Sequence, residues 1–123
     1  MTMRYLALLT IFVSAAACGD VSGDPAGGAD SPRAAMVAQI GLVRSAATEH
    51  LRPHFTERLR NKFSDDDVVG AAKDLGEYDV DDLIGTIEME DADRAKIKMA
   101  NGRTLTTLVR RNGRWLADTI WFR

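Results

Sequence analysis

The most conspicuous group of reactive side chains is a histidine pair, His50 and His54, with Glu49 and Glu57 nearby. Two histidines four residues apart lie on one face of a helix, where they can bind zinc. Pro53 interrupts a helix between them, and the HExxH pattern with its intervening general base is absent. A zinc site also needs three or four converging ligands. We therefore interpret the pair as surface residues at a helix junction and predict no metal site.

Two acidic clusters, at residues 65–67 and 79–82, hold the side chains that calcium prefers. A calcium loop needs ligands at alternating positions around a turning glycine and a distal glutamate, and neither cluster has that arrangement. Ser64 precedes the first cluster, which is typical of a helix N-terminus with a capping box. Capping and solubility therefore account for both clusters.

The remaining catalytic motifs are missing from the sequence. It has no Gly-x-Ser-x-Gly elbow, no glycine-rich phosphate loop and no dinucleotide fingerprint. No two titratable groups are arranged for opposite acid and base roles. We therefore predict that the chain is not an enzyme, with no catalytic residues, no cofactor-binding residues and no cofactor.

Basic side chains occur in two places that are candidate anion-binding positions. Arg58 and Lys62 share one predicted helix face, and Arg110, Arg111 and Arg114 crowd the last turn of the chain. A contact with a headgroup or polyanion is one interpretation. Since the chain carries a net charge of -2, a solvated face and a charged turn that protects a sheet edge are favoured.

Composition excludes several classes of protein. The 123 residues include 16 Lys and Arg against 18 Asp and Glu, which lacks the basic excess of a nucleic-acid-binding protein. A hydrophobic content of 46% is too high for a disordered chain, and one cysteine excludes a disulfide scaffold. The chain has room for one small domain.

The single cysteine, Cys18, follows what is predicted to be an export signal. Arg4 gives a positive start, residues 5–13 are apolar and residues 14–17 are small. The apolar run is too short to span a bilayer. The segment resembles the lipobox of bacterial lipoproteins, although Ala15 stands where leucine is commonest. The alternative is ordinary cleavage after Ala17, which leaves a free thiol.

The lipobox resemblance implies that Cys18 carries a diacylglyceryl group and that its new amino group is acylated, for example with palmitate. Two or more acyl chains hold a protein stably on a membrane, whereas one binds only marginally. Without Arg4, 15 basic and 18 acidic residues remain, a net charge of -3, so the lipid is expected to be the whole anchor. The expected location is the bacterial cell envelope, on the non-cytoplasmic side of a membrane.

Three segments follow from this organisation. Residues 1–17 are predicted to be a cleaved signal peptide, and residues 18–32 a lipidated cysteine with a flexible Gly/Asp/Pro tether. Residues 33–123 are predicted to form one α+β domain. No internal repeat is visible.

The domain is predicted to begin with three helices. Ser31 and Pro32 form a start signal, and the apolar stripe that follows predicts a helix to residues 50–52. A second helix is expected from Pro53 to Phe63. The third opens at Ser64 and stops at Gly76.

After Tyr78 the hydrophobic period changes to two, which predicts a four-stranded antiparallel meander. We expect three-residue turns at Asn101-Gly102 and Asn112-Gly113, and another at residues 91–93. These turns place Glu90 opposite Arg94, and Glu88 opposite Lys96, on a wet outer face. The same register pairs Arg110 with Arg114.

Three helices before a meander, whose last hairpin reads Val109-Arg-Arg-Asn-Gly-Arg-Trp115, resemble the nuclear transport factor 2-like superfamily. The similarity covers residues 31–123, and the nearest branch is a set of small bacterial lipoproteins and secreted antigens of unassigned function. It implies a cone-like fold, with a curved sheet wrapped around a long helix. Because the superfamily includes isomerases, dehydratases, adaptors and non-catalytic members, the fold assigns no chemistry.

In the catalytic branches an acid or base lies inside the cone. Tyr78 and Asp118 are the only candidates, and no matching motif surrounds them. Asp118 alternates away from Trp115 and Trp121, which points it out of the cone. An isomerase or dehydratase is therefore the most distant of the three functions considered.

We favour a non-catalytic, membrane-anchored domain that binds a protein partner or a second copy of itself, and no nucleic acid. The predicted register clusters apolar residues on the outer sheet face, which marks a candidate interaction face. Its members are Leu108, Leu116, Ile120 and Phe122. The alternative is a carrier or sensor of a small apolar ligand inside the cone. That ligand would lie among Met36, Ile40, Met99, Trp115 and Trp121.

Overall fold

The computed structural model describes residues 27–123, so the predicted signal peptide and Cys18 lie outside the described residues. The helical elements are α2 (Pro32–Arg44), α3 (Thr48–Leu51), the 3-10 turns η3 (Arg52–His54) and η4 (Glu57–Leu59), α4 (Asp65–Leu75) and α5 (Val80–Leu83). The strands are β1 (Thr86–Asp91), β2 (Arg94–Lys98), β3 (Thr104–Arg111) and β4 (Arg114–Ala117). The order β1-β2-β3-β4 confirms the predicted α+β class and its antiparallel meander.

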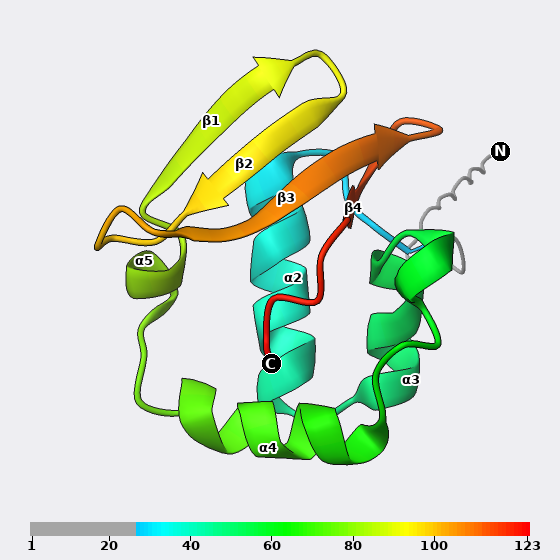
Figure 1. Cartoon of the computed structure of the whole chain (residues 1–123), viewed down its shortest axis with the longest axis vertical. Helices are drawn as coiled ribbons and strands as arrows, with labels where there is room; N and C mark the ends of the chain where they lie inside the picture. Colours follow the sequence, from blue (N-terminus) through cyan, green and yellow to red (C-terminus); the bar gives the residue numbers. More distant parts are fainter. Residues whose placement is uncertain (1–26) are drawn as a thin grey trace, which may run out of the picture.

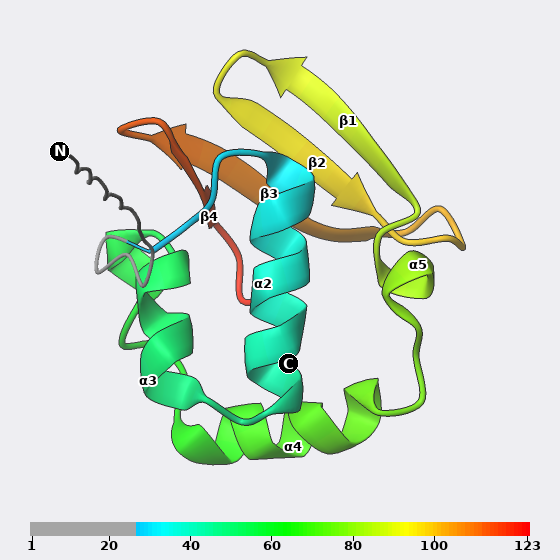
Figure 2. The ribbon, with the colours of Figure 1, turned by 180° about the vertical axis from the view of Figure 1, so that it is seen from behind.

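The sheet crosses one side of α2, while α4 lies across the far end of that helix (Figures 1 and 2). The core fills the space between α2 and the sheet, with Met36 and Ile40 of the helix buried against Ile97 and Trp115 of the strands. No helix among the described residues is long and apolar enough to cross a membrane.

Helix α2 begins as predicted but ends early. Ser31 is the N-cap, and its Oγ accepts a hydrogen bond from the Ala34 amide at 3.1 Å. The helix stops at Arg44 rather than at residues 50–52, because Ala46 adopts a φ of 53°. The amides of residues 46 and 47 bond back to the carbonyls of Val43 and Leu42, which is a Schellman ending. Alanine rarely occupies that left-handed position, so the sequence carries no sign of it.

The second predicted helix, from Pro53 to Phe63, is wrong. The segment forms two 3-10 turns, η3 and η4, around Phe55, whose φ of -111° and ψ of 156° are extended. Phe55 pairs in parallel with Ala117 of β4, and the Thr56 amide donates to the Ala117 carbonyl at 3.0 Å. Pairing with a strand sixty residues away overrides the local helical pattern.

The third helix is confirmed as α4, with the predicted capping box between Ser64 and Asp67. Asp79 and Asp82 form a second capping box at the start of the four-residue helix α5, which the sequence analysis did not predict. Asp67 of the first cluster, and Asp79 and Asp82 of the second, therefore serve in helix capping.

The hairpins differ from the predicted register in three places. Glu88 faces Lys96 as expected, but Asp91 rather than Glu90 lies opposite Arg94. The β2–β3 turn is closed by the Met99 amide, which donates to the Arg103 carbonyl. A bulge beyond it then shifts every later pair of β2 and β3 by one residue.

The last hairpin has a two-residue turn rather than the predicted three-residue turn. Asn112 and Gly113 have φ values of 53° and 78°, as a tight turn of this hand requires. Arg111 therefore lies opposite Arg114, and Arg110 lies opposite Trp115.

Because of the register change, the predicted interaction face is not an exposed apolar surface. The bulge turns Leu108 to the inner side of the sheet, where it is fully buried opposite Ala117. Leu116 lies on the outer side but is only 6% exposed. Ile120 and Phe122 pack against the core, and the Phe122 ring meets Phe55, Phe63 and Trp121 nearly edge-on at 5.1–5.9 Å.

Candidate functional site

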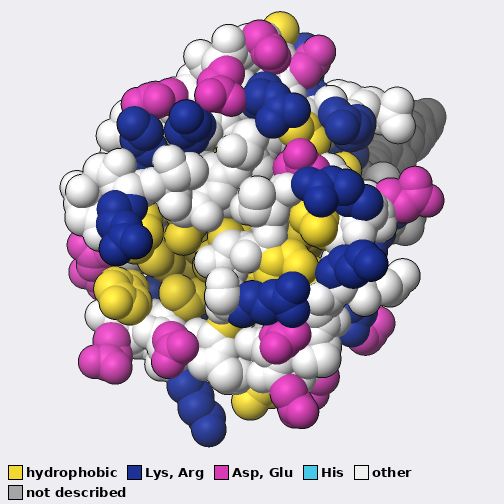
Figure 3. Space-filling model, viewed as in Figure 1, with side chains coloured by type: hydrophobic (Ala, Val, Ile, Leu, Met, Phe, Trp, Pro, Cys, Tyr) yellow, Lys and Arg dark blue, Asp and Glu magenta, His cyan; other side chains and the backbone are white. Residues whose placement is uncertain are grey.

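An open crevice of about 410 Å³ lies beside the β3–β4 turn, and its walls carry three arginines. It is lined by Thr56, Glu57, Arg60, Arg111, Asn112, Arg114 and Leu116. These residues come from the η4 segment on one side and from the last hairpin on the other, which lie at the same end of the molecule (Figure 1). In the space-filling view, Lys and Arg side chains lie around this end of the sheet and also over its other end, with Asp and Glu side chains among them (Figure 3).

The tight Asn112-Gly113 turn brings two of the arginines together. Because the turn has two residues, Arg111 and Arg114 are direct cross-strand neighbours with their side chains on one face. Like charges in such positions are destabilising. Arg111 is exposed, and its side chain forms no hydrogen bond or ion pair with the described residues.

Arg114 is hydrogen-bonded to the first residues that the structure describes. Its side chain donates hydrogen bonds to the carbonyls of Gly27 and Gly28, the second at 2.7 Å. The Trp115 amide bonds to the Ala29 carbonyl at 2.8 Å. Gly28 has a φ of 74°, and a Cβ there would lie 2.9 Å from the Leu116 side chain. Residues 27–30, at the end of the predicted tether, therefore lie against β4.

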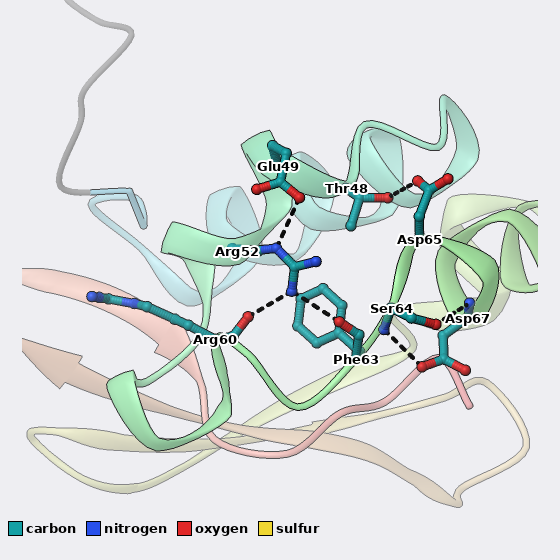
Figure 4. A network of polar contacts seen from close by, with 8 residues as sticks. All are labelled: Thr48, Glu49, Arg52, Arg60, Phe63, Ser64, Asp65 and Asp67. Carbon is teal, nitrogen blue, oxygen red and sulfur yellow. Dashed lines mark hydrogen bonds and ion pairs between the residues drawn. The ribbon is translucent and has the colours of Figure 1, made fainter.

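Arg60 forms the opposite wall of the crevice, and Arg52 fixes its backbone. Arg52 Nη1 donates to the carbonyls of Arg60 and Phe63, both at 2.8 Å, while its Nε pairs with Glu49 at 3.0 Å (Figure 4). The Arg60 Nε donates to the Phe55 carbonyl at 3.0 Å. The rest of its guanidinium extends away from this network (Figure 4).

The crevice is lined by basic side chains although the whole chain is acidic. Among the described residues its lining holds three guanidinium groups and one carboxylate, that of Glu57, and the Arg114 guanidinium is already hydrogen-bonded to the Gly27 and Gly28 carbonyls. Guanidinium groups bind phosphate and carboxylate oxygens in pairs through parallel N–H donors. The arrangement suits binding of an oxyanion.

His54 lies behind this wall and supports the entering chain. Its Nδ1 accepts a hydrogen bond from the Gly28 amide at 3.3 Å. Burial, and then the positive charge of Arg114, hold the pKa of His54 below its ordinary value. The neutral imidazole is therefore the form that accepts the hydrogen bond from the Gly28 amide.

We expect the free energy of unfolding to fall as the pH drops from about 7.5 to about 5, with a contribution from His54. The pKa of His54 is lowered in the folded state, so the unfolded chain takes up its proton first, from near pH 6.5. Stability from this group is full above that pH and is lost as the pH falls through the folded pKa.

Urea unfolding of the wild type and of His54→Gln across this pH range checks the expectation. Gln keeps a hydrogen-bond acceptor but cannot titrate, so the difference between the two proteins isolates His54. Parallel pH curves for the two proteins would contradict it.

The other residues singled out in the sequence are dispersed. His50 is exposed, and no cluster of three or more His, Cys, Asp or Glu in the described part could hold a metal ion. Asp118 pairs with Arg58 at 3.0 Å and accepts a hydrogen bond from Thr56. Tyr78 is 48% exposed, and its carbonyl accepts a hydrogen bond from Arg44.

The basic residues of the sequence analysis separate into two groups. Arg58 and Arg110 are paired elsewhere, the latter with Asp93 at 2.9 Å. Arg111 and Arg114 line the crevice. Arg60 was missed, because the predicted helix gave no reason to place it beside the last hairpin.

Comparisons of the chain with protein-family models, with curated proteins and with solved structures found no match.

Proposed function

We propose that this protein is a bacterial envelope lipoprotein, anchored through acyl chains on Cys18, whose folded domain binds without catalysing a reaction. The sequence pattern around Cys18 supports the anchor. The described residues 27–123 form one hydrophobic core.

The observation that carries the binding role is the crevice. It is open, lined by arginine side chains and adjacent to Gly27, the first residue that the structure describes. The lowered pKa values of His54 and Asp67 each have a structural cause. The Asp67 pKa is lowered by the capping hydrogen bond from the Ser64 amide. Neither group is part of an acid–base pair.

The resemblance to the nuclear transport factor 2-like superfamily remains part of this proposal. The four-stranded meander packed across α2 supports it, and a cone around that helix is the finer arrangement it implies. A small apolar ligand inside such a cone would compete with the core for space. Met36, Ile40, Trp115 and Trp121 pack into one buried cluster, which favours binding at the surface over a carrier.

The anchor is tested by Cys18→Ser expressed in a bacterial host. We expect the wild type in the membrane fraction with the mass of an acylated N-terminal cysteine. The variant is expected to be soluble or to remain an uncleaved precursor, because the atom that accepts the diacylglyceryl group is gone. Cell fractionation and intact mass measure both outcomes.

A matched control carries Ser22→Cys together with Cys18→Ser. It restores one thiol four residues away from the lipobox position, and we expect no membrane anchoring. Wild-type protein with an unmodified Cys18 would contradict the proposed anchor.

A further inference from the structure

The tripeptide Asn-Gly-Arg occurs at residues 101–103 and again at residues 112–114. The first copy joins β2 to β3 and the second joins β3 to β4, so the two turns lie at opposite ends of β3 (Figure 1). An asparagine before glycine loses ammonia readily, because glycine has no Cβ to hinder attack by its amide nitrogen. Both asparagines are exposed and both are followed by Gly-Arg, so the turns themselves decide which one reacts.

In the first turn, hydrogen bonds hold both reacting groups. The Gly102 amide donates to the Met99 carbonyl at 2.9 Å. The Asn101 Oδ1 accepts a hydrogen bond from the Arg103 amide, also at 2.9 Å. Attack needs the glycine nitrogen in line with the side-chain carbon of the asparagine and within about 3.5 Å of it. The rotation that brings the two atoms together breaks both hydrogen bonds.

The second turn lacks these two hydrogen bonds. Neither the Gly113 amide nor the Asn112 side chain forms a hydrogen bond with any of residues 27–123. Asn112 also has a left-handed φ of 53°, so leaving the turn conformation releases backbone strain. Rotation about this peptide therefore has none of the hydrogen-bond cost that protects Asn101.

We propose that Asn112 is a site of spontaneous deamidation, and that the fold protects Asn101 from the same reaction. Hydroxide takes the proton of the Gly113 amide, and the nitrogen attacks Asn112 Cγ to close a succinimide ring. The Cγ–Nδ2 bond breaks, and Nδ2 leaves as ammonia with a proton from water, which regenerates hydroxide. Water then opens the ring at either carbonyl and gives aspartate or isoaspartate. The reaction exchanges ammonia for water, and it needs neither the anchor nor a ligand.

The reaction adds a negative charge to the crevice. Among the described residues that line the crevice, Glu57 is the one carboxylate, and aspartate at position 112 is a second. Aspartate keeps the tight turn, since Asp-Gly suits such turns as Asn-Gly does. Isoaspartate adds a carbon atom to the main chain, which lengthens the two-residue turn that sets Arg111 opposite Arg114. The two products therefore differ in their effect on the last hairpin.

The test follows both asparagines in one peptide. Purified protein is incubated in mildly alkaline H₂¹⁸O and then cleaved after its lysines, which releases residues 99–123 with both Asn-Gly pairs. Fragmentation mass spectrometry gives the rate at each site, and ¹⁸O marks the reaction that occurred during the incubation. We expect Asn112 to react roughly ten-fold faster than Asn101, the ratio that two hydrogen bonds of ordinary net strength produce.

The same protein unfolded in urea is the matched control, and we expect nearly equal rates at the two sites there. Asn112→Asp should abolish the fast release of ammonia, while Asn101→Asp should leave it unchanged, with circular dichroism confirming that both variants are folded. Equal rates in the folded protein, or a faster Asn101, would overturn the proposal. So would a folded protein that reacts at neither site. A rate ratio that persists in urea would also overturn it, because the difference would then come from the local sequence and not from the fold.

Discussion

Trp115→Ala is expected to lower the free energy of unfolding by about 3–5 kcal/mol, enough to unfold a marginally stable domain. The ring is 4% exposed and belongs to the core between α2 and the sheet. Its loss leaves a cavity that the surrounding side chains fill only in part. Urea unfolding followed by circular dichroism measures the change, since tryptophan fluorescence itself is altered.

Two variants separate the contribution of the Trp115 ring to stability from that of the neighbouring guanidinium group. Trp115→Phe keeps an aromatic ring and should be less destabilising than Trp115→Ala. Arg110→Ala removes the guanidinium that lies 5.9 Å from the ring centroid, at an exposed site. We expect it to cost less than about 1 kcal/mol. A loss below about 1 kcal/mol for Trp115→Ala would show that the ring is not part of the core.

Gln39→Leu is expected to cost about 2–5 kcal/mol, although it replaces a polar side chain by an apolar one in the core. Gln39 is fully buried, and its Oε1 accepts a hydrogen bond from Trp121 Nε1 at 2.9 Å. Its Nε2 donates to the His54 carbonyl at 3.3 Å. Leucine fills the volume but leaves the buried Trp121 Nε1 and the partly buried His54 carbonyl without this hydrogen bond. A fully buried unsatisfied group costs about 1–3 kcal/mol, and a partly buried one costs less.

A double-mutant cycle with Trp121→Phe tests this cause directly. Phenylalanine lacks the indole N–H, so combining it with Gln39→Leu should cost clearly less than the sum of the two single changes. Additive losses in urea unfolding would mean that the hydrogen bond between Gln39 and Trp121 contributes nothing of its own.

Features that depend on neighbouring residues could be predicted from the sequence. Ser31 and Ser64 cap helices because their hydroxyl groups meet amides three residues on, and both caps were found. The alternation after Tyr78 likewise predicted the meander in its correct order. These contacts are local, so the sequence contains both partners side by side.

Features that depend on distant partners could not be predicted from the sequence. Phe55 is extended because it pairs with Ala117, and Leu108 is buried because a bulge near Ile97 shifts the register. A shift of one residue turns every following side chain to the other face. The same limitation hid the crevice, since Arg60 joins Arg111 only through the folded arrangement of the η4 segment and the last hairpin.

The pairing of β4 determines how late in synthesis the sheet can finish folding. The edge of β4 that does not pair with β3 forms two isolated bridges, Ala29 with Trp115 and Phe55 with Ala117. These early segments therefore cannot complete their pairing before β4 is present. Synthesis delivers a chain from its N-terminus, and residues 114–117 are the last of the described strands to emerge. The sheet cannot close until residue 117 is available, so the described part of the chain stays incompletely folded until β4 has been synthesised.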